Sequence, residues 1–198
     1  MVESIYKNDY RPFQAGKSLP RISTVLDSVR TYQFEIQFFG LPPALTGQQT
    51  DLTLAAKQVS PVGFTVDDIE VRRVNDRVFF PGAPSQDELT VTFDNLYLRD
   101  TAKTLWEWFK TIYDPISGDM TKLSAPGGAG NRAFKANKIR IIELDNTRTP
   151  HSAIELYGVY PKSVRFAEKN YSTNEFHTIE VTFRYDFMDF FNYGSKNQ

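Results

Sequence analysis

The chain contains no cysteine among its 198 residues, which excludes disulfide bonds, thiolate metal sites and cysteine nucleophiles. No stretch approaches the roughly 18 consecutive apolar residues of a membrane span, and residues 1–7 lack the apolar run of a signal peptide. We therefore expect no membrane insertion of the subunit. The formal net charge is only -1, so there is no broad basic surface to hold nucleic acid by counterion release.

Side chains that support catalysis are also scarce. The two histidines, His151 and His177, have no second histidine or carboxylate at metal-ligand spacing. Asp67 and Asp68 are neighbours in a predicted strand, where adjacent side chains point to opposite faces and cannot converge on one substrate. The glycine-rich residues 124–130 lack the Gly-Lys-Ser/Thr ending of a phosphate loop. We therefore predict no catalytic residue, no metal site and no cofactor, and a protein that is not an enzyme.

Aromatic residues are plentiful, with 16 Phe and 10 Tyr, and these side chains favour pleated surfaces and large contacts. Alternation of apolar and polar residues predicts many strands. They cover residues 31–39, 52–59, 66–74, 77–80, 88–93, 134–144, 153–159 and 174–187. The pattern predicts a mainly β fold of two packed antiparallel sheets, a β-sandwich or barrel, with one flanking α-helix.

The predicted last strand, at residues 174–187, has the clearest alternation. Its apolar face holds Ile179, Val181, Phe183, Tyr185 and Phe187. Its polar face holds Thr178, Glu180, Thr182, Arg184 and Asp186. Such a strand has one buried face and one face in contact with water.

A charged hairpin is predicted near the middle of the chain. The strand at residues 66–74 is expected to point Ile69 and Val71 inward, and Asn75–Asp76 is read as the turn, because Asn and Asp tolerate positive φ. The partner strand at residues 77–80 is expected to end at the prolines of residues 81–84.

The helix is predicted over residues 101–113, with Asp100 as a side-chain N-cap. Its apolar stripe comprises Ala102, Leu105, Trp106, Phe109, Ile112 and Tyr113. Trp108 lies off that stripe, as a rim residue or as a contact for another chain. A long loop follows at residues 114–132, and loops of this length are usually functional or disordered.

Residues 26–192 therefore form the predicted β-sandwich domain, with the loop at 114–132 inserted in it. Residues 1–25 are predicted to form an N-terminal arm, and residues 193–198 a C-terminal tail. Both an arm ordered on a partner surface and a flexible arm fit the sequence.

The order of these segments resembles that of the tail tube proteins of contractile-tailed (myovirus-type) bacteriophages, whose fold is similar to the type VI secretion inner tube. The matching segments are the aromatic strand at 32–36, the charged hairpin, the strand at 89–93, the helix with Leu-Trp-Glu-Trp-Phe at 105–109, a turn at 157–161 and the alternating terminal strand. The resemblance covers residues 30–190. The arm and the loop at 114–132 are longer than in compact members of that family.

The resemblance implies a structural virion protein. Such subunits form homohexameric rings, whose inner sheets join into one barrel, and the rings stack into the inner tube that conducts DNA during ejection. The implied partners are the tail sheath protein, the tape-measure protein, and the baseplate and tail terminator proteins, while double-stranded DNA transits without specific binding. The implied location is the phage tail, assembled in the host cytoplasm.

Two sets of residues are candidates for roles in such a tube. The first, for contacts between subunits or stacked rings, is Asn75, Asp76, Arg77, Val78, Phe79 and Phe80. The second, for lining the channel, is Thr178, Glu180, Thr182, Arg184 and Asp186. An ordinary solvent-facing surface is an equal alternative for the second set. Other functions left open are a baseplate tube initiator or tail-end cap of the same fold, and a carbohydrate-binding β-sandwich that would stack sugars on Trp108.

Overall fold

The structure is a computed structural model that describes residues 30–126, 132–172 and 174–193, so the predicted arm at residues 1–25 lies outside the described residues. Its strands are β1 (Phe34–Phe39), β2 (Ala56–Val59), β3 (Phe64–Arg73), β4 (Asp76–Gln86), β5 (Leu89–Asp94), β6 (Ala136–Leu144), β7 (Pro150–Phe166), β8 (Thr178–Arg184) and β9 (Phe187–Asn192). Its α-helices are α3 (Gln49–Ala55) and α4 (Thr101–Lys110), and short 3-10 turns span Pro43–Leu45, Tyr97–Arg99 and Thr121–Ser124.

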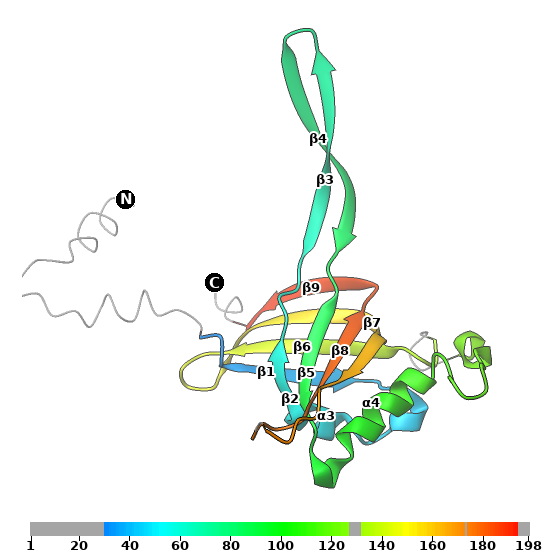
Figure 1. The fold of residues 1–198 in the computed structure, drawn as a ribbon. Coiled ribbons are helices and arrows are strands. Elements are labelled where there is room, and N and C mark those ends of the chain that lie inside the picture. The colour runs from blue at the N-terminus through cyan, green and yellow to red at the C-terminus, as the bar shows by residue number, and fades with distance from the viewer. Residues whose placement is uncertain (1–29, 127–131, 173, 194–198) are drawn as a thin grey trace, which may run out of the picture.

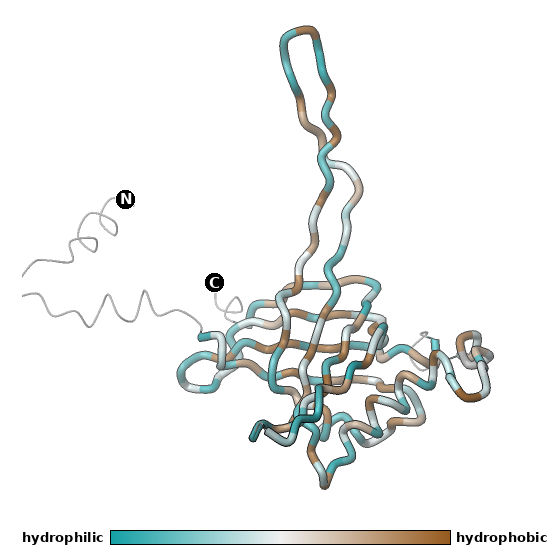
Figure 2. The backbone as a smooth tube through the Cα atoms, viewed as in Figure 1, coloured by the Kyte–Doolittle hydropathy of each residue, from teal (hydrophilic) through white to brown (hydrophobic). Residues whose placement is uncertain are grey.

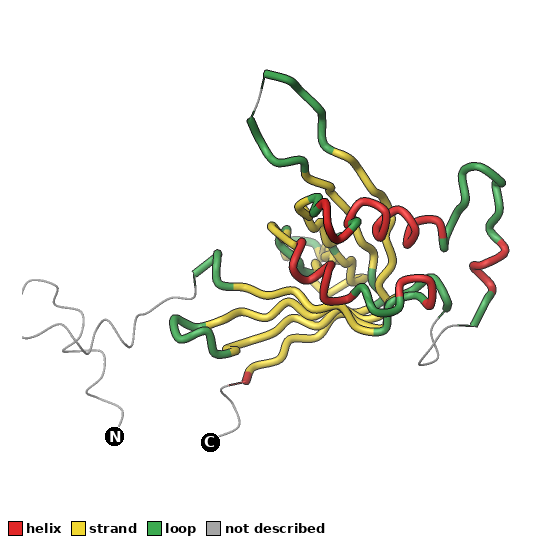
Figure 3. The backbone as a smooth tube through the Cα atoms, turned by 90° about the horizontal axis from the view of Figure 1, so that it is seen from below, coloured by secondary structure: helices red, strands yellow, loops and turns green. Residues whose placement is uncertain are grey.

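Two antiparallel sheets share the long strand β7. The first, here called sheet A, has the order β1-β6-β7-β9, and the second, sheet B, has the order β7-β8-β5-β2. Residues up to Val159 of β7 pair within sheet A, and residues from Tyr160 onward pair with β8 in sheet B. Helices α3 and α4 contact each other and pack against β1 and β7 respectively (Figures 1 and 3). The predicted mainly β fold of two antiparallel sheets is confirmed, with two helices instead of one.

Aromatic side chains fill the space between the two sheets. The ring of Phe38 in sheet A lies 6.1 Å from that of Phe93 and 6.5 Å from that of Phe183, both in sheet B. Trp108 of α4 completes this cluster, 5.3 Å from Phe183. All four side chains are buried. Contacts of this kind, added to the burial of apolar area, hold the sheets and the helix together as one core.

The predicted turn at residues 157–161 is instead the point where β7 bends from sheet A into sheet B. Gly158 has φ 66°, a left-handed conformation that residues with a side chain rarely adopt. A Cβ at this position would lie 2.1 Å from a carboxylate oxygen of Asp186. Asp186 connects β8 to β9 and donates its backbone N–H to the Tyr157 carbonyl at 2.9 Å. Glycine is therefore needed at the point where β7 and the β8–β9 connection pass from one sheet to the other.

The strand predicted at residues 174–187 is confirmed in its centre. Ile179, Val181, Phe183 and Tyr185 are buried, as the alternation predicts. Phe187 is 57% exposed, because the chain turns at Asp186 and begins a further strand, β9. The prediction that this is the last strand was therefore wrong.

Both helices differ from the sequence prediction. Residues 49–55 form helix α3, so residues 52–55 are helical and are not the start of the strand predicted at 52–59. Leu52 and Ala55 are buried at helical spacing. In α4 the buried residues are Thr101, Thr104, Leu105 and Trp108.

Trp108 is thus a core residue and not an external contact, and its indole N–H donates to the Phe134 carbonyl at 3.0 Å. Trp106 lies on the half-buried side of α4, stacked on Phe109 at 5.7 Å. Asp100 occupies the N-cap position in a left-handed conformation but makes no side-chain capping hydrogen bond, so the prediction of a side-chain cap was wrong.

The β3–β4 hairpin projects away from the two sheets (Figure 1). Every residue of β3 is exposed, so the prediction that Ile69 and Val71 face inward was wrong. The turn is Val74–Asn75, and Asn75 does not have positive φ. The prolines at residues 81 and 84 lie within β4, opposite Asp68 and Val66, and do not end the pairing.

We predict that Gly158→Ala lowers the free energy of unfolding by more than Gly118→Ala. Both glycines have positive φ, which costs a residue with a Cβ about 1–2 kcal/mol. Only Gly158 would also displace Asp186, since nothing lies within 4 Å of a Cβ at Gly118. Chemical denaturation of both variants measures the difference, and equal losses would show that the Asp186 contact does not constrain the bend.

Candidate assembly surfaces

The hairpin carries an apolar strip along one face. In the β3–β4 register, Ile69 lies opposite Phe80 and Val71 lies opposite Val78. Directly opposed residues point to the same side of a strand pair, so these four side chains form one continuous surface, here called the apolar strip. Phe80 is 53% exposed and Ile69 is 54% exposed. Figure 2 shows the hydrophobic positions rising along the hairpin, away from the rest of the fold.

The opposite face of the hairpin is charged. Arg72 and Arg77 face each other in the register, and both bind the carboxylate of Glu70, at 2.9 Å and 3.4 Å. Phe79 lies on this face, opposite Glu70. The predicted stacking segment is thus divided: Val78 and Phe80 belong to the apolar strip, Phe79 and Arg77 to the charged face, and Asn75 to the tip.

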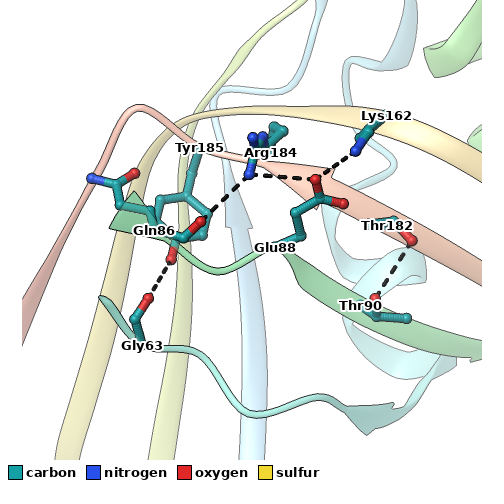
Figure 4. Close-up of polar contacts among 8 residues, drawn as sticks. All are labelled: Gly63, Gln86, Glu88, Thr90, Lys162, Thr182, Arg184 and Tyr185. Carbon is teal, nitrogen blue, oxygen red and sulfur yellow. Dashed lines mark hydrogen bonds and ion pairs between the residues drawn. The ribbon is translucent and has the colours of Figure 1, made fainter. Parts of the chain in front are cut away.

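Hydrogen bonds hold the base of the hairpin to sheet B (Figure 4). The Tyr185 hydroxyl donates to the Gly63 carbonyl at 3.3 Å, and Arg184 donates to the Gln86 carbonyl at 3.4 Å. Gly63 immediately precedes β3, and Gln86 is the last residue of β4. Although the hairpin itself is exposed, its point of departure from the domain is fixed.

The structure places four of the five predicted channel residues on the outer face of β8, in sheet B. Thr182 lies 3.4 Å from the Thr90 hydroxyl, and Arg184 lies 3.3 Å from Glu88, which also binds Lys162 at 2.5 Å (Figure 4). The hydrogen bond from Lys162 lowers the pKa of the Glu88 carboxyl. The remaining two residues, Thr178 and Glu180, precede them on the same strand.

Asp186 is not brought together with these residues. It lies at the bend beside Gly158, where its carboxylate binds Lys135 at 2.7 Å. The prediction that it shares the polar face of β8 was therefore wrong, because the regular strand ends at Arg184.

The outer face of sheet A carries a charged cluster that sequence reasoning missed. Glu155 of β7 binds Lys138 at 3.0 Å and Arg140 at 2.6 Å, both from β6, and accepts a hydrogen bond from the Tyr157 hydroxyl. The side chains of Glu155, Lys138 and Arg140 are 13%, 22% and 27% exposed. Phe39 completes the group, since Lys138 and Arg140 each lie 5.3 Å from its ring centroid.

These partners determine the ionisation of Glu155. Burial by itself would raise the pKa of this carboxyl, but the hydrogen bonds from Tyr157, Lys138 and Arg140 and the charge of Arg140 outweigh it and lower the pKa to about 2. The same hydrogen bond to Glu155 raises the pKa of Tyr157. Asp189, opposite Glu155 on β9, is the nearest like charge in the register. Glu155 therefore stays ionised and bound to both cations at all physiological pH values.

Strand β9 forms one edge of sheet A and exposes aromatic side chains. It pairs with β7, and among the described residues no strand pairs with its other edge. Phe187, Phe190 and Phe191 are 57%, 60% and 41% exposed. An edge with free backbone N–H and C=O groups and apolar side chains recruits a further strand.

Within the described residues, no group of three metal-ligating side chains occurs, and no helix is long and apolar enough to cross a membrane. A depression of about 390 Å³ lies between the sheets near β1 and β2, lined in part by Phe34, Val59 and Ile154. Its lining is mainly apolar and also includes Arg30 and Glu143.

No family model matches the chain, and no curated protein matches it in sequence. Its fold does match solved structures. A chain of the sheath-tube complex of the extracellular contractile injection system PVC, in the extended state, aligns with a TM-score of 0.62 and 15% identity, covering 89% of this chain and 99% of that chain.

Two further structures come from the anti-feeding prophage. Its tube terminating cap aligns with a TM-score of 0.61 and 15% identity, over 83% of this chain and 91% of that chain. Its baseplate aligns with a TM-score of 0.60 and 10% identity, over 83% and 96% of the two chains. The prediction of a tail-tube fold is confirmed, and these similar structures belong to structural assemblies rather than enzymes.

We predict that the stability difference between wild-type protein and Glu155→Gln depends on pH. Because the folded pKa of Glu155 is about 2, below its ordinary 4.5, the ionised carboxylate contributes about 3 kcal/mol above pH 5. That contribution declines as pH falls from 5 toward 2. Denaturation of both proteins at pH 7, 4 and 2.5 measures it. A constant difference across this range would show that the ion pairs do not stabilise the fold.

Proposed function

We propose that this protein is a tube subunit of a contractile tail, which forms hexameric rings that stack into the inner tube and conduct double-stranded DNA during ejection. The observation that carries the proposal is the projecting hairpin, whose apolar strip remains exposed among the described residues of its own subunit. The proposed partners are further copies of the chain, the sheath, the tape-measure protein, and the baseplate and terminator proteins.

Stacking of rings would bury the apolar strip. A folded monomer gains nothing from holding Ile69, Val71, Val78 and Phe80 in water, while burial of such side chains against a second copy stabilises by about 25 cal/mol per Å² of apolar surface. The fixed base at Tyr185 and Arg184 would present the strip to the next ring in a constant position.

Closure of rings would use the edges of sheet A. Strands β1 and β9 form opposite edges of this sheet, and each has six residues. Pairing of β9 in one subunit with β1 of the next would extend the hydrogen bonding of both edges and bring the exposed phenylalanines beside the next subunit. Repetition around the ring joins every sheet A into one continuous wall around a channel.

A cap or baseplate component of the same fold is the second candidate. The anti-feeding prophage cap and baseplate chains align over most of their lengths with TM-scores of 0.61 and 0.60. Electron microscopy of the purified protein over a concentration series separates the two functions. A tube subunit gives long hollow tubes, and a cap or initiator gives single rings.

We predict that Phe80→Ser prevents stacking more strongly than Phe79→Ser. Phe80 is a member of the apolar strip, whereas Phe79 lies among the charges of Glu70, Arg72 and Arg77. Because the hairpin is exposed, both variants should fold with unchanged circular dichroism. The concentration needed for tube formation should rise at least about tenfold for Phe80→Ser, which corresponds to about 1.4 kcal/mol. Tubes formed by Phe80→Ser at the wild-type concentration would exclude the apolar strip from stacking.

We predict that Phe190→Asp prevents ring closure without unfolding the subunit. Phe190 lies on the free edge strand and is 60% exposed, so the monomer has little to lose, while a closed ring would bury a charge. Phe176→Asp is the matched control, because Phe176 is 89% exposed and lies outside every strand. Light scattering of Phe190→Asp should detect monomers and no oligomers. The control variant should form the same oligomers as the wild-type protein. Normal rings from Phe190→Asp would contradict closure through β9.

A further inference from the structure

We propose that Glu155 masks Lys138 and Arg140 from DNA, so that the outer face of sheet A lets a polyanion slide past without binding. This inference rests on the proposed function, in which sheet A forms the wall of the channel. It assigns a role to one carboxylate: to keep the two cations of this face occupied within the subunit.

The contacts of the cluster support masking. One oxygen of Glu155 binds both Lys138 and Arg140, at 3.0 Å and 2.6 Å. Both cations also lie over the ring of Phe39, and Lys138 lies 5.7 Å from the ring centroid of Tyr157. The negative charge of Glu155 beside both cations weakens their attraction for a phosphate. A phosphate that displaced the carboxylate would leave a mostly buried charge without its partners, which costs more than for an exposed group.

The position of the cluster supports a role toward the channel. Sheet A is the sheet whose edge strand β9 exposes three phenylalanines, which is the mark of a sheet that continues into a second copy. The corresponding edge strand of sheet B, β2, has the sequence Ala-Lys-Gln-Val and offers no aromatic contact. The sheet that continues across each subunit boundary is the one that encloses the channel.

Sheet B contains a similar arrangement that serves as a control. There Glu88 binds Lys162 and Arg184, but these cations are 54% and 44% exposed. Glu155→Gln and Glu88→Gln each remove one carboxylate that binds two cations, on opposite sheets. If sheet A lines the channel, only the first substitution creates a DNA-binding surface inside the tube.

The first experiment measures binding of a fluorescent 20-base-pair DNA duplex to full-length subunits at 50 and 200 mM salt. If Glu155→Gln frees two cations for phosphates, its affinity for DNA should fall about tenfold more than that of the wild-type protein over this range of salt. Each phosphate contact contributes about -0.9 to the slope of log affinity against log salt concentration. Asp189→Asn is the matched control: it removes a carboxylate from the same face without removing a partner of Lys138 or Arg140. It should therefore retain the wild-type salt dependence.

A triple variant, Glu155→Gln with Lys138→Gln and Arg140→Gln, should return to the wild-type salt dependence, because no cation is freed. If Glu155→Gln itself bound DNA with the same salt dependence as the wild-type protein, the masking role would be overturned. An equal increase in Asp189→Asn would also overturn it, since net charge alone would then explain binding.

The second experiment assembles tubes with the duplex present and then adds nuclease. Tubes of Glu155→Gln should protect DNA, while wild-type and Glu88→Gln tubes should not. Protection by Glu88→Gln tubes alone would place sheet B, not sheet A, at the channel and overturn the inference while leaving the tube function intact. Failure of the wild-type protein to form tubes at any concentration would instead overturn the proposed function and with it the channel position of Glu155.

Discussion

The passage of β7 from one sheet to the other is the constraint on which the rest of the structure depends. At Gly158 the strand bends with φ 66°, and the connection between β8 and β9 changes sheet beside it at Asp186. The Asp186 carboxylate occupies the space that a Cβ would need, and Lys135 binds it at 2.7 Å. Because β7 belongs to both sheets, this bend fixes the edge strand β9 of sheet A relative to the hairpin that continues from sheet B.

Aromatic side chains gather both in the buried core and on exposed strands. Phe38, Phe93, Phe183 and Trp108 are buried between the sheets, where packing is complete. The phenylalanines of the hairpin and of β9 are largely exposed, although a monomer would be more soluble without them. Both exposed groups lie on strands that project from the sheets or end them, which are the positions from which a second copy can be reached. This distribution fits the proposed tube function, in which contacts with further copies would bury the exposed groups.

Sequence patterns correctly predicted those strands that have one face on the core and the other face in solvent. In β8 one face packs on the core and the other meets solvent, so alternation identified Ile179, Val181 and Phe183 correctly. It failed at residues 52–55, where Leu52 and Leu54 alternate as in a strand, yet Leu52 and Ala55 are the buried pair of a helix. Gly158 signalled a break in regular structure, but a turn and a bend within a strand give the same local pattern. The prolines of β4 are tolerated because a projecting hairpin needs no further strand beside it.

The Glu155 cluster could not be predicted, because it depends on the pairing of β6 with β7, which brings residues from separate strands together. Its chemistry explains why a channel wall would retain cations at all. Lys138 and Arg140 cover the rings of Phe39 and Tyr157, so replacing them with neutral residues would remove cation–π contacts and expose apolar surface. Pairing both cations with one ionised carboxylate keeps those contacts and still leaves few free positive charges for phosphates. If this face lines the channel as proposed, a polyanion can slide over it although its cations remain, because one carboxylate occupies both of them.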